Sequence, residues 1–140
     1  MPSISRHEFE TRFADLLSPA GSVRLRTGES ESVERAIVYL EADPTHWGSG
    51  YACAALIHRL KWLPLSAAQQ ERLRTVVLRA IDARDRQEFR SFCRLAASVQ
   101  SPEFLAQLTQ RAESPDSGVC RRAGWMLDYL ARYAHSNRTA

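Results

Sequence analysis

Two stretches of this sequence place aromatic, basic and acidic side chains along one face of an expected helix. Tyr51, His58 and Trp62 follow one another at steps of seven and four residues, which keeps them on one helical face. Seventy positions further on, the corresponding face carries Arg121, Trp125, Asp128 and Arg132. Aromatic and arginine side chains supply most of the binding energy at protein interfaces. These seven residues are therefore the candidate contacts for a partner.

The tryptophans also permit a purely structural explanation. Large aromatic side chains are mostly buried in folded proteins. Trp62 and Trp125 would then pack against neighbouring helices and contact no partner. The two explanations differ in the burial that they require of both indole rings.

Residues that could catalyse a reaction or hold a metal form no recognisable pattern. The four histidines are scattered and lack the spacing of zinc ligands: His7, His46, His58 and His135. No glycine-rich loop has the sequence that cradles phosphate. Cys53 lies five residues before His58, which does not put a thiol and a base on one helical face. We expect a protein that is not an enzyme and that uses no cofactor and no metal.

The three cysteines fit buried thiols better than a disulfide framework. Cys53 and Cys93 lie forty residues apart, each at a small apolar position of an expected helix. With Cys120 the count is odd, which argues against a set of structural disulfides. We expect Cys53 and Cys93 to lie in the core and to react slowly with thiol reagents.

Capping sequences divide the chain into about seven helices. Ser5 and Ser66 each precede Glu or Gln by three residues, and Asp85 precedes Glu88 in the same way. Ser101 and Ser114 each stand before a proline, which suits the first position of a helix. We expect helices over residues 5–17, 32–42, 47–63 and 66–83, and further helices that begin near 85, 101 and 114. Residues 18–30 are expected to form a polar connection, and residues 135–140 a frayed tail.

A weak internal repeat relates these helices. Val33, Ala36, Ile37 and Leu40 recur forty positions later as Leu73, Val76, Val77 and Ala80. Ser49, Cys53, Leu56 and Ile57 recur at the same offset as Phe89, Cys93, Ala96 and Ala97. A shared offset predicts a repeated two-helix unit, which is typical of α-solenoids. We expect one all-α domain of antiparallel helix pairs over residues 30–63, 66–99 and 101–134, with helix 5–17 as a cap. A compact helical bundle is the alternative.

The last pair resembles a HEAT repeat. Such repeats have an Asp in the turn, followed by Val, Arg and Ala on the second helix, and the corresponding residues here are Asp116, Val119, Arg121 and Ala123. In the middle pair, Phe89, Arg90 and Cys93 occupy the Val, Arg and Ala positions. The resemblance covers about residues 30–134. It implies a right-handed stack of helix pairs that serves as a binding scaffold, and it carries no catalytic residue to this chain.

The composition leaves two classes of function. The 140 residues are 44% apolar and 25% charged, as in ordinary globular proteins, and we expect a cytoplasmic protein without a membrane segment. The first class is a non-catalytic protein-binding module, such as an adaptor, an inhibitor or an immunity-type protein. The second is a small basic nucleic-acid-binding accessory subunit. Its candidate phosphate contacts are Arg90, Arg94, Arg121 and Arg122.

Charge favours the first class. The chain has 18 Arg and one Lys, and residues 71–140 carry 12 basic against eight acidic side chains. This excess could attract nucleic acid or an acidic protein. Acidic residues occur at nearly every helical turn, however, which argues against a continuous phosphate-binding surface. We therefore expect the partner to be another protein.

Overall fold

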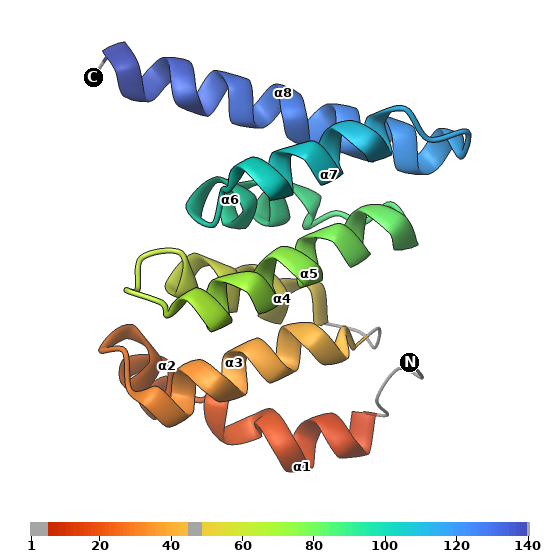
Figure 1. The fold of residues 1–140 in the computed structure, drawn as a ribbon. Coiled ribbons are helices and arrows are strands. Elements are labelled where there is room, and N and C mark those ends of the chain that lie inside the picture. The colour runs from red at the N-terminus through yellow and green to blue at the C-terminus, as the bar shows by residue number, and fades with distance from the viewer. Residues whose placement is uncertain (1–5, 45–48, 140) are drawn as a thin grey trace. The chain divides into compact units, whose positions relative to one another are not determined.

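The computed structural model describes residues 6–44 and 49–139, and all the secondary structure in that part is helical (Figure 1). The prediction of an all-α fold is confirmed. None of the described helices is long and apolar enough to cross a bilayer. The eight helices found there are α1 (Arg6–Leu17), α2 (Pro19–Arg26), α3 (Ser30–Ala42), α4 (Ser49–Leu60), α5 (Ala67–Ala83), α6 (Phe89–Ser98), α7 (Pro102–Ala112) and α8 (Ser117–Thr139).

The chain divides into two compact units, residues 1–69 and residues 70–140. The first holds α1 to α4, and the second holds α6 to α8 and nearly all of α5. The division lies close to the predicted border between the first two helix pairs. The single domain and the repeated stack remain predictions.

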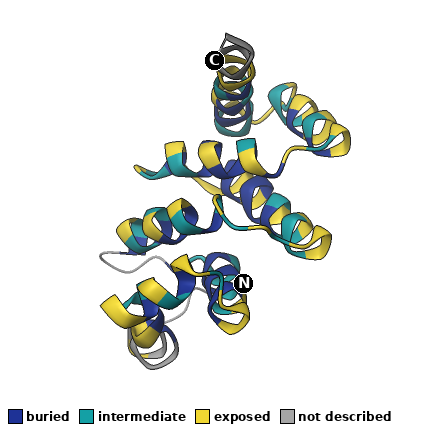
Figure 2. Cartoon of the chain, turned by 90° about the vertical axis from the view of Figure 1, so that its left-hand side faces the viewer, coloured by how far each residue is buried: buried dark blue, intermediate teal, exposed yellow. Residues whose placement is uncertain are grey.

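In the first unit, α1, α2, α3 and α4 pack around buried aromatic and aliphatic side chains. The ring of Phe13 on α1 meets Tyr39 on α3 edge-on, with centroids 5.0 Å apart. Tyr39 is fully buried, and its hydroxyl donates to the Ser49 carbonyl at the start of α4 at 3.5 Å. Other buried side chains are Leu16, Leu25, Val33, Ile37, Leu40, Cys53, Leu56, Ile57 and Leu60. The helices therefore present the apolar faces expected from their periodicity, as the dark stripes in Figure 2 show.

Helix α2 was not predicted, because residues 18–30 were expected to be a polar connection. Ser18 caps the helix by accepting a hydrogen bond from the Gly21 amide at 3.0 Å, and Pro19 occupies the first turn. This is the same Ser-Pro signal that was recognised at Ser101. Gly21 permits the tight bend between α1 and α2, since a Cβ there would lie 2.0 Å from the Asp15 carbonyl oxygen. Part of the expected connection therefore forms a helix of its own.

In the second unit, three arginines tie the later helices to α5. Arg74 on α5 donates to the carbonyl of Val99 at the end of α6. Arg111 on α7 binds Asp82 through two hydrogen bonds of 2.9 and 3.0 Å. Arg122 on α8 donates to the Ile81 carbonyl at 2.7 Å. The buried side chains of this unit include Leu73, Val77, Ile81, Phe92, Leu95, Phe104, Leu108 and Met126.

Two of the predicted caps are confirmed. Ser66 and Gln69 form a reciprocal capping box at the start of α5, with bonds of 2.9 and 3.1 Å. Ser101 accepts from the Phe104 amide at 3.1 Å and begins α7. Both sites follow directly from the spacing of their side chains. The cap predicted at Ser5 lies outside the described residues.

Two further caps were predicted at the wrong residue. Helix α6 begins at Phe89 without a side-chain cap, because Asp85 is engaged by arginines of α8 instead. Helix α8 begins at Ser117 rather than near Ser114. Its cap is Asp116, whose Oδ1 accepts from two amides of the first turn at 2.9 and 3.1 Å. The carboxylate satisfies two amides at once, where the Ser114 hydroxyl would satisfy one.

Two helix ends also differ from expectation. Helix α8 continues to Thr139, although residues 135–140 were expected to fray. Helix α4 ends at Leu60 rather than at residue 63, and its predicted start, Trp47, lies outside the described residues, as does His46. Helix α7 and the first part of α8 run side by side after a short connection (Figure 1).

Candidate functional site

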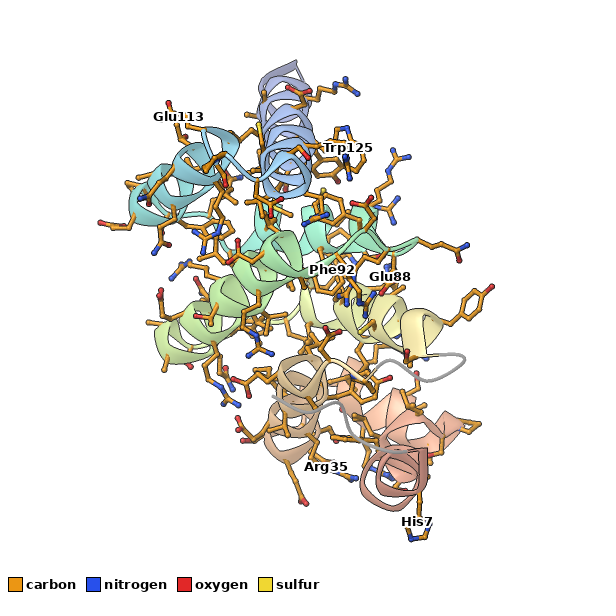
Figure 3. The ribbon with its side chains drawn as sticks, turned by 90° about the vertical axis from the view of Figure 1, so that its right-hand side faces the viewer. His7, Arg35, Glu88, Phe92, Glu113 and Trp125 are labelled. Atoms are coloured by element: carbon orange, nitrogen blue, oxygen red, sulfur yellow. The ribbon has the colours of Figure 1, made fainter. Side chains whose placement is uncertain are left out.

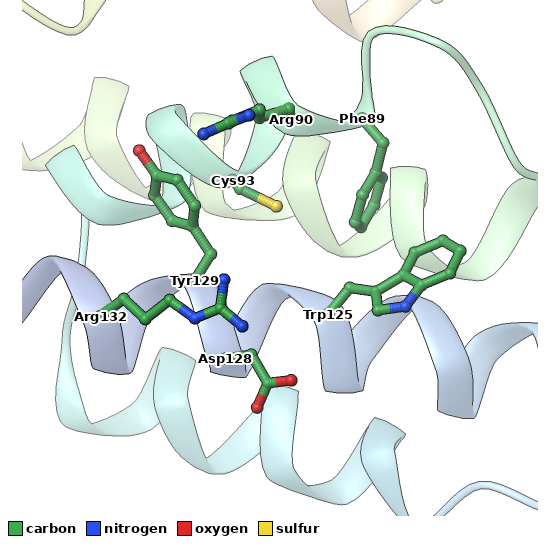
Figure 4. A pocket seen from close by; sticks show the side chains of 7 residues that line it. All are labelled: Phe89, Arg90, Cys93, Trp125, Asp128, Tyr129 and Arg132. Atoms are coloured by element: carbon green, nitrogen blue, oxygen red, sulfur yellow. The ribbon is translucent and has the colours of Figure 1, made fainter.

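An open hollow of about 310 Å³ lies between α6 and α8 of the second unit (Figure 4). Three of the predicted partner-facing residues line it, namely Trp125, Asp128 and Arg132. They belong to α8 at steps of three and four residues, as the predicted stripe requires. Helix α6 closes the other side. This helix contributes Phe89, Arg90 and Cys93 to the lining, and α8 also contributes Tyr129.

Trp125 is the exposed aromatic residue of this site. Half of its surface, 50%, is accessible, and Figure 3 shows the side chain projecting from α8. Its ring meets Phe89 of α6 edge-on, with centroids 6.2 Å apart. The Arg121 guanidinium lies over the same ring, 5.3 Å from its centroid. The indole is thus held between an aromatic and a cationic neighbour while part of it stays open to solvent.

Arg121 is itself held by a carboxylate. Its guanidinium donates to Asp85 at 2.7 Å, and Arg122 donates to the other oxygen of Asp85 at 2.8 Å. These two hydrogen bonds, first from Arg122 and then from Arg121, lower the pKa of the Asp85 carboxyl below its ordinary value. Asp85 therefore joins the start of α8 to the connection between α5 and α6. Through Arg121 it also orients Trp125.

The thiol of Cys93 points into the middle of the hollow (Figure 4). Only 4% of the residue is exposed, as predicted for a core cysteine. Burial raises the pKa of the Cys93 thiol to about 11, against a small opposing effect of Arg90. At neutral pH the sulfur is a neutral, polarizable wall of the site and a poor nucleophile.

The charged side chains around the hollow are mostly basic. Arg90, Asp128 and Arg132 line it and are exposed. The structure shows no side-chain hydrogen bond or ion pair for these three among the residues it describes. Arg94, one turn beyond Arg90 on α6, is exposed as well. The hollow therefore presents an excess of guanidinium groups that are open to an incoming group.

The four arginines predicted to contact phosphate differ in exposure and in their partners. Arg90 and Arg94 are exposed, but Arg122 is 6% exposed and bonded to Asp85 and to the Ile81 carbonyl. Arg121 is exposed and paired with Asp85. Arg122 thus holds helices together, and the expectation that it faces solvent is corrected by its burial.

The other three predicted contacts lie in the first unit. Tyr51 is 79% exposed on the first turn of α4, and Trp62 is 75% exposed just after the end of that helix. The Lys61 ammonium lies 5.4 Å from the centroid of the Trp62 ring. His58 is exposed at the edge of a smaller hollow of about 140 Å³ between α1, α2 and α4. The structural explanation for the tryptophans, burial against other helices, does not hold for Trp62 and holds only in part for Trp125.

Sequence reasoning missed three residues of the hollow. Phe89 and Cys93 were assigned to the core of a repeat, and they are indeed buried, yet one edge of each faces the hollow. Tyr129 was not singled out. It lies four residues after Trp125, so the helical spacing that selected Trp125 would also have selected Tyr129.

Among the described residues, no group of three or more His, Cys, Asp or Glu side chains could hold a metal ion. Comparison of the chain with models of protein families, with curated proteins and with solved structures found no match.

Proposed function

We propose that this protein is a non-catalytic protein-binding module that contacts its partner through the face formed by α6 and α8. The observation that carries the proposal is Trp125, half exposed and held between Phe89 and Arg121 beside an open hollow. A preoriented aromatic ring with an arginine neighbour is the usual composition of an interface hot spot. An adaptor, an inhibitor or an immunity-type protein would use such a surface.

Nucleic-acid binding is the weaker candidate. Arg122 is buried, and Arg121 already pairs with Asp85, so two of the four proposed phosphate contacts have partners within the chain. Arg90 and Arg94 remain, and the hollow that Arg90 lines also contains the carboxylate of Asp128. Binding that depends on phosphate needs several unpaired cations along one path.

We also propose that the helix pairs form a HEAT-like stack. The support is the shared offset of forty residues between the apolar positions of α3 and α5 and between those of α4 and α6. The side-by-side packing of α7 and α8 agrees with one such pair. Small-angle X-ray scattering tests this proposal. A profile that matches a compact bundle, and not a stack of pairs, contradicts it.

The interface proposal is tested with the tagged protein in an extract of its source organism. Proteins retained by the wild type are identified by mass spectrometry, and the one retained at stoichiometric yield is purified. Its affinity is then measured for the wild type and for Trp125→Ala. We expect the Kd to rise about 30-fold, which corresponds to a loss of about 2 kcal/mol.

Gln107→Ala is the matched control, because Gln107 is exposed on α7 and does not line the hollow. Its Kd should stay within about two-fold of wild type, since an exposed side chain that does not line the hollow should contribute little to the binding free energy. Both variants must keep the helical circular dichroism of the wild type. Equal affinity of wild type and Trp125→Ala would contradict the proposal.

A further inference from the structure

The two ends of the hollow between α6 and α8 differ in chemistry. Phe89 and Trp125 occupy one end, and Arg90 with Tyr129 occupies the other (Figure 4). The Cys93 thiol lies between them as an apolar wall. An occupant that fits both ends has an apolar group next to a group that can accept hydrogen bonds from guanidinium and phenol.

The charges of the lining indicate which hydrogen-bond acceptor the occupant carries. The lining holds two guanidiniums, those of Arg90 and Arg132, and one carboxylate, that of Asp128. Arg94 adds a further exposed cation on α6. Arginine recognises carboxylates through paired N–H donors, and such bonds are about twice as strong as those between neutral groups. A carboxylate is therefore the complementary group.

The size of the hollow limits what can enter it. About 310 Å³ is at the lower end of the range of roughly 300–1,000 Å³ found for ligand pockets. This space accepts one or two side chains of a segment that crosses the face. The segment would have to place an acidic and an apolar side chain side by side.

We propose that the hollow binds an acidic segment of a partner protein, with an Asp or Glu carboxylate between Arg90 and Arg132 and the neighbouring apolar side chain against Phe89 and Trp125. This inference rests on the proposed function, because it specifies the chemistry of the partner at the same surface. Charge complementarity selects the acidic segment. The excess of basic side chains in residues 71–140 would favour its approach over that of a basic segment.

The probe is a synthetic peptide with the core Glu-Phe-Glu between Gly-Ser flanks, titrated into the full chain. The indole N–H signal of Trp125 is followed by NMR and assigned with Trp125→Phe. We expect the signal to shift in a saturable manner. The Gln-Phe-Gln peptide should bind about ten-fold more weakly or worse, because it keeps the aromatic group and lacks the charges.

Two variants test the arginines. Arg90→Gln combined with Arg132→Gln should weaken the Glu-Phe-Glu peptide about ten-fold or more. The matched control is Arg26→Gln, an exposed arginine of α2 in the first unit, which should leave the affinity unchanged. Because Arg90, Arg132 and Arg26 are all exposed, we expect unchanged circular dichroism in each variant.

Equal binding of the Glu and Gln peptides, or no shift of the Trp125 signal, would overturn the inference. So would equal losses in the double variant and in Arg26→Gln. The proposed function fails separately: it fails if Trp125→Ala leaves the affinity for the purified partner unchanged. A partner that needs Trp125 but tolerates Arg90→Gln with Arg132→Gln would sustain the proposed function and contradict the acidic segment.

Discussion

At the residue scale, the central arrangement is a chain of contacts from Asp85 through Arg121 to Trp125. Asp85 binds both Arg121 and Arg122, and the Arg121 guanidinium lies over the exposed indole. Arg122 is 6% exposed, so its charge depends on Asp85 for compensation. One carboxylate therefore serves two purposes: it holds the start of α8, and it orients the residue most suited to contact a partner.

The first prediction concerns Asp85→Asn. The lowered pKa means that the ionised Asp85 stabilises the folded state above the ordinary aspartate value of about 3.9, and that this stabilisation is lost as the pH falls through the lowered pKa. Urea unfolding at pH 7 should show the variant to be less stable than wild type. At pH 3 and below, the difference should shrink.

Glu113→Gln is the control for this experiment. Glu113 is an exposed carboxylate at the end of α7, for which the described residues show no ion pair. Its substitution should change the free energy of unfolding at pH 7 much less than Asp85→Asn does. A constant difference between Asp85→Asn and wild type from pH 7 to pH 2 would contradict the account of the two hydrogen bonds.

The second prediction concerns the thiols. Cys53 and Cys93 are 2% and 4% exposed, and burial raises the pKa of the Cys93 thiol to about 11. A maleimide reagent should therefore label both only on the time scale of unfolding at pH 7, and Cys93 should react faster as the pH approaches 11. Mass spectrometry of digested samples gives the rate at each site. Rapid labelling of Cys93 in the native protein at pH 7 would mean that reagents reach this thiol from the hollow, which would contradict its burial.

The sequence predicted much of the α8 side of the site, but it did not predict that α6 forms the other side. The spacing of Trp125, Asp128 and Arg132 along one helix was enough to place them together. The pairing of Arg121 and Arg122 with Asp85 joins residues 36 and 37 positions apart. Local spacing carries no information about such contacts, so Asp85 was taken for a helix cap.

At the element scale, the locations of α3, α5 and α7 followed from periodicity and caps, whereas α2 did not. Its eight residues, Pro19–Arg26, include a glycine, which lowers the expectation of a helix. The helix forms because Ser18 caps it and because Gly21 allows α1 to approach closely. Tertiary packing thus overrides a weak local preference.

The third prediction compares two helical glycines. A Cβ at Gly21 would lie 2.0 Å from the Asp15 carbonyl oxygen and 2.7 Å from that of Leu16, whereas a Cβ at Gly124 on α8 would meet no atom within 4 Å. Gly21→Ala should therefore destabilise the protein by about 1–3 kcal/mol, because the α1 backbone must move. Gly124→Ala should stabilise it by about 0.5–1 kcal/mol through helix propensity alone.

Both free energies are obtained from urea unfolding followed by circular dichroism. The pair controls for the chemistry of the substitution, since the same methyl group is added inside a helix each time. If Gly21→Ala were as stable as wild type, the close approach of α1 and α2 would be refuted. A loss of stability in Gly124→Ala would place that side of α8 against another part of the chain.

At the scale of the whole molecule, the all-helical secondary structure of the described residues was predictable, because the apolar positions of most expected helices follow a helical period. The repeat offset also predicted which positions are buried: Val33, Ile37, Leu73 and Val77 all lie in the core. A repeat in the sequence does not determine how successive units are arranged. The choice between a stack and a bundle therefore requires scattering data.

The fourth prediction separates the two classes of partner. With Arg122 buried and Arg121 paired, random-sequence RNA or double-stranded DNA should bind only weakly at physiological salt. Fluorescence anisotropy at several salt concentrations measures this. Tight binding that weakens steeply as salt rises, and that is abolished by Arg90→Gln with Arg94→Gln, would favour nucleic acid as the partner.

The central claim is that a protein partner binds over α6 and α8, and hydrogen–deuterium exchange of the purified complex tests it most directly. Peptides that cover residues 89–98 and 117–132 should exchange more slowly in the complex than in the free chain, because the bound partner excludes solvent from these helices. Peptides from α7 residues that do not line the hollow should change little. Protection confined to residues 49–65, around Tyr51 and Trp62, with none in α6 or α8, would contradict the account.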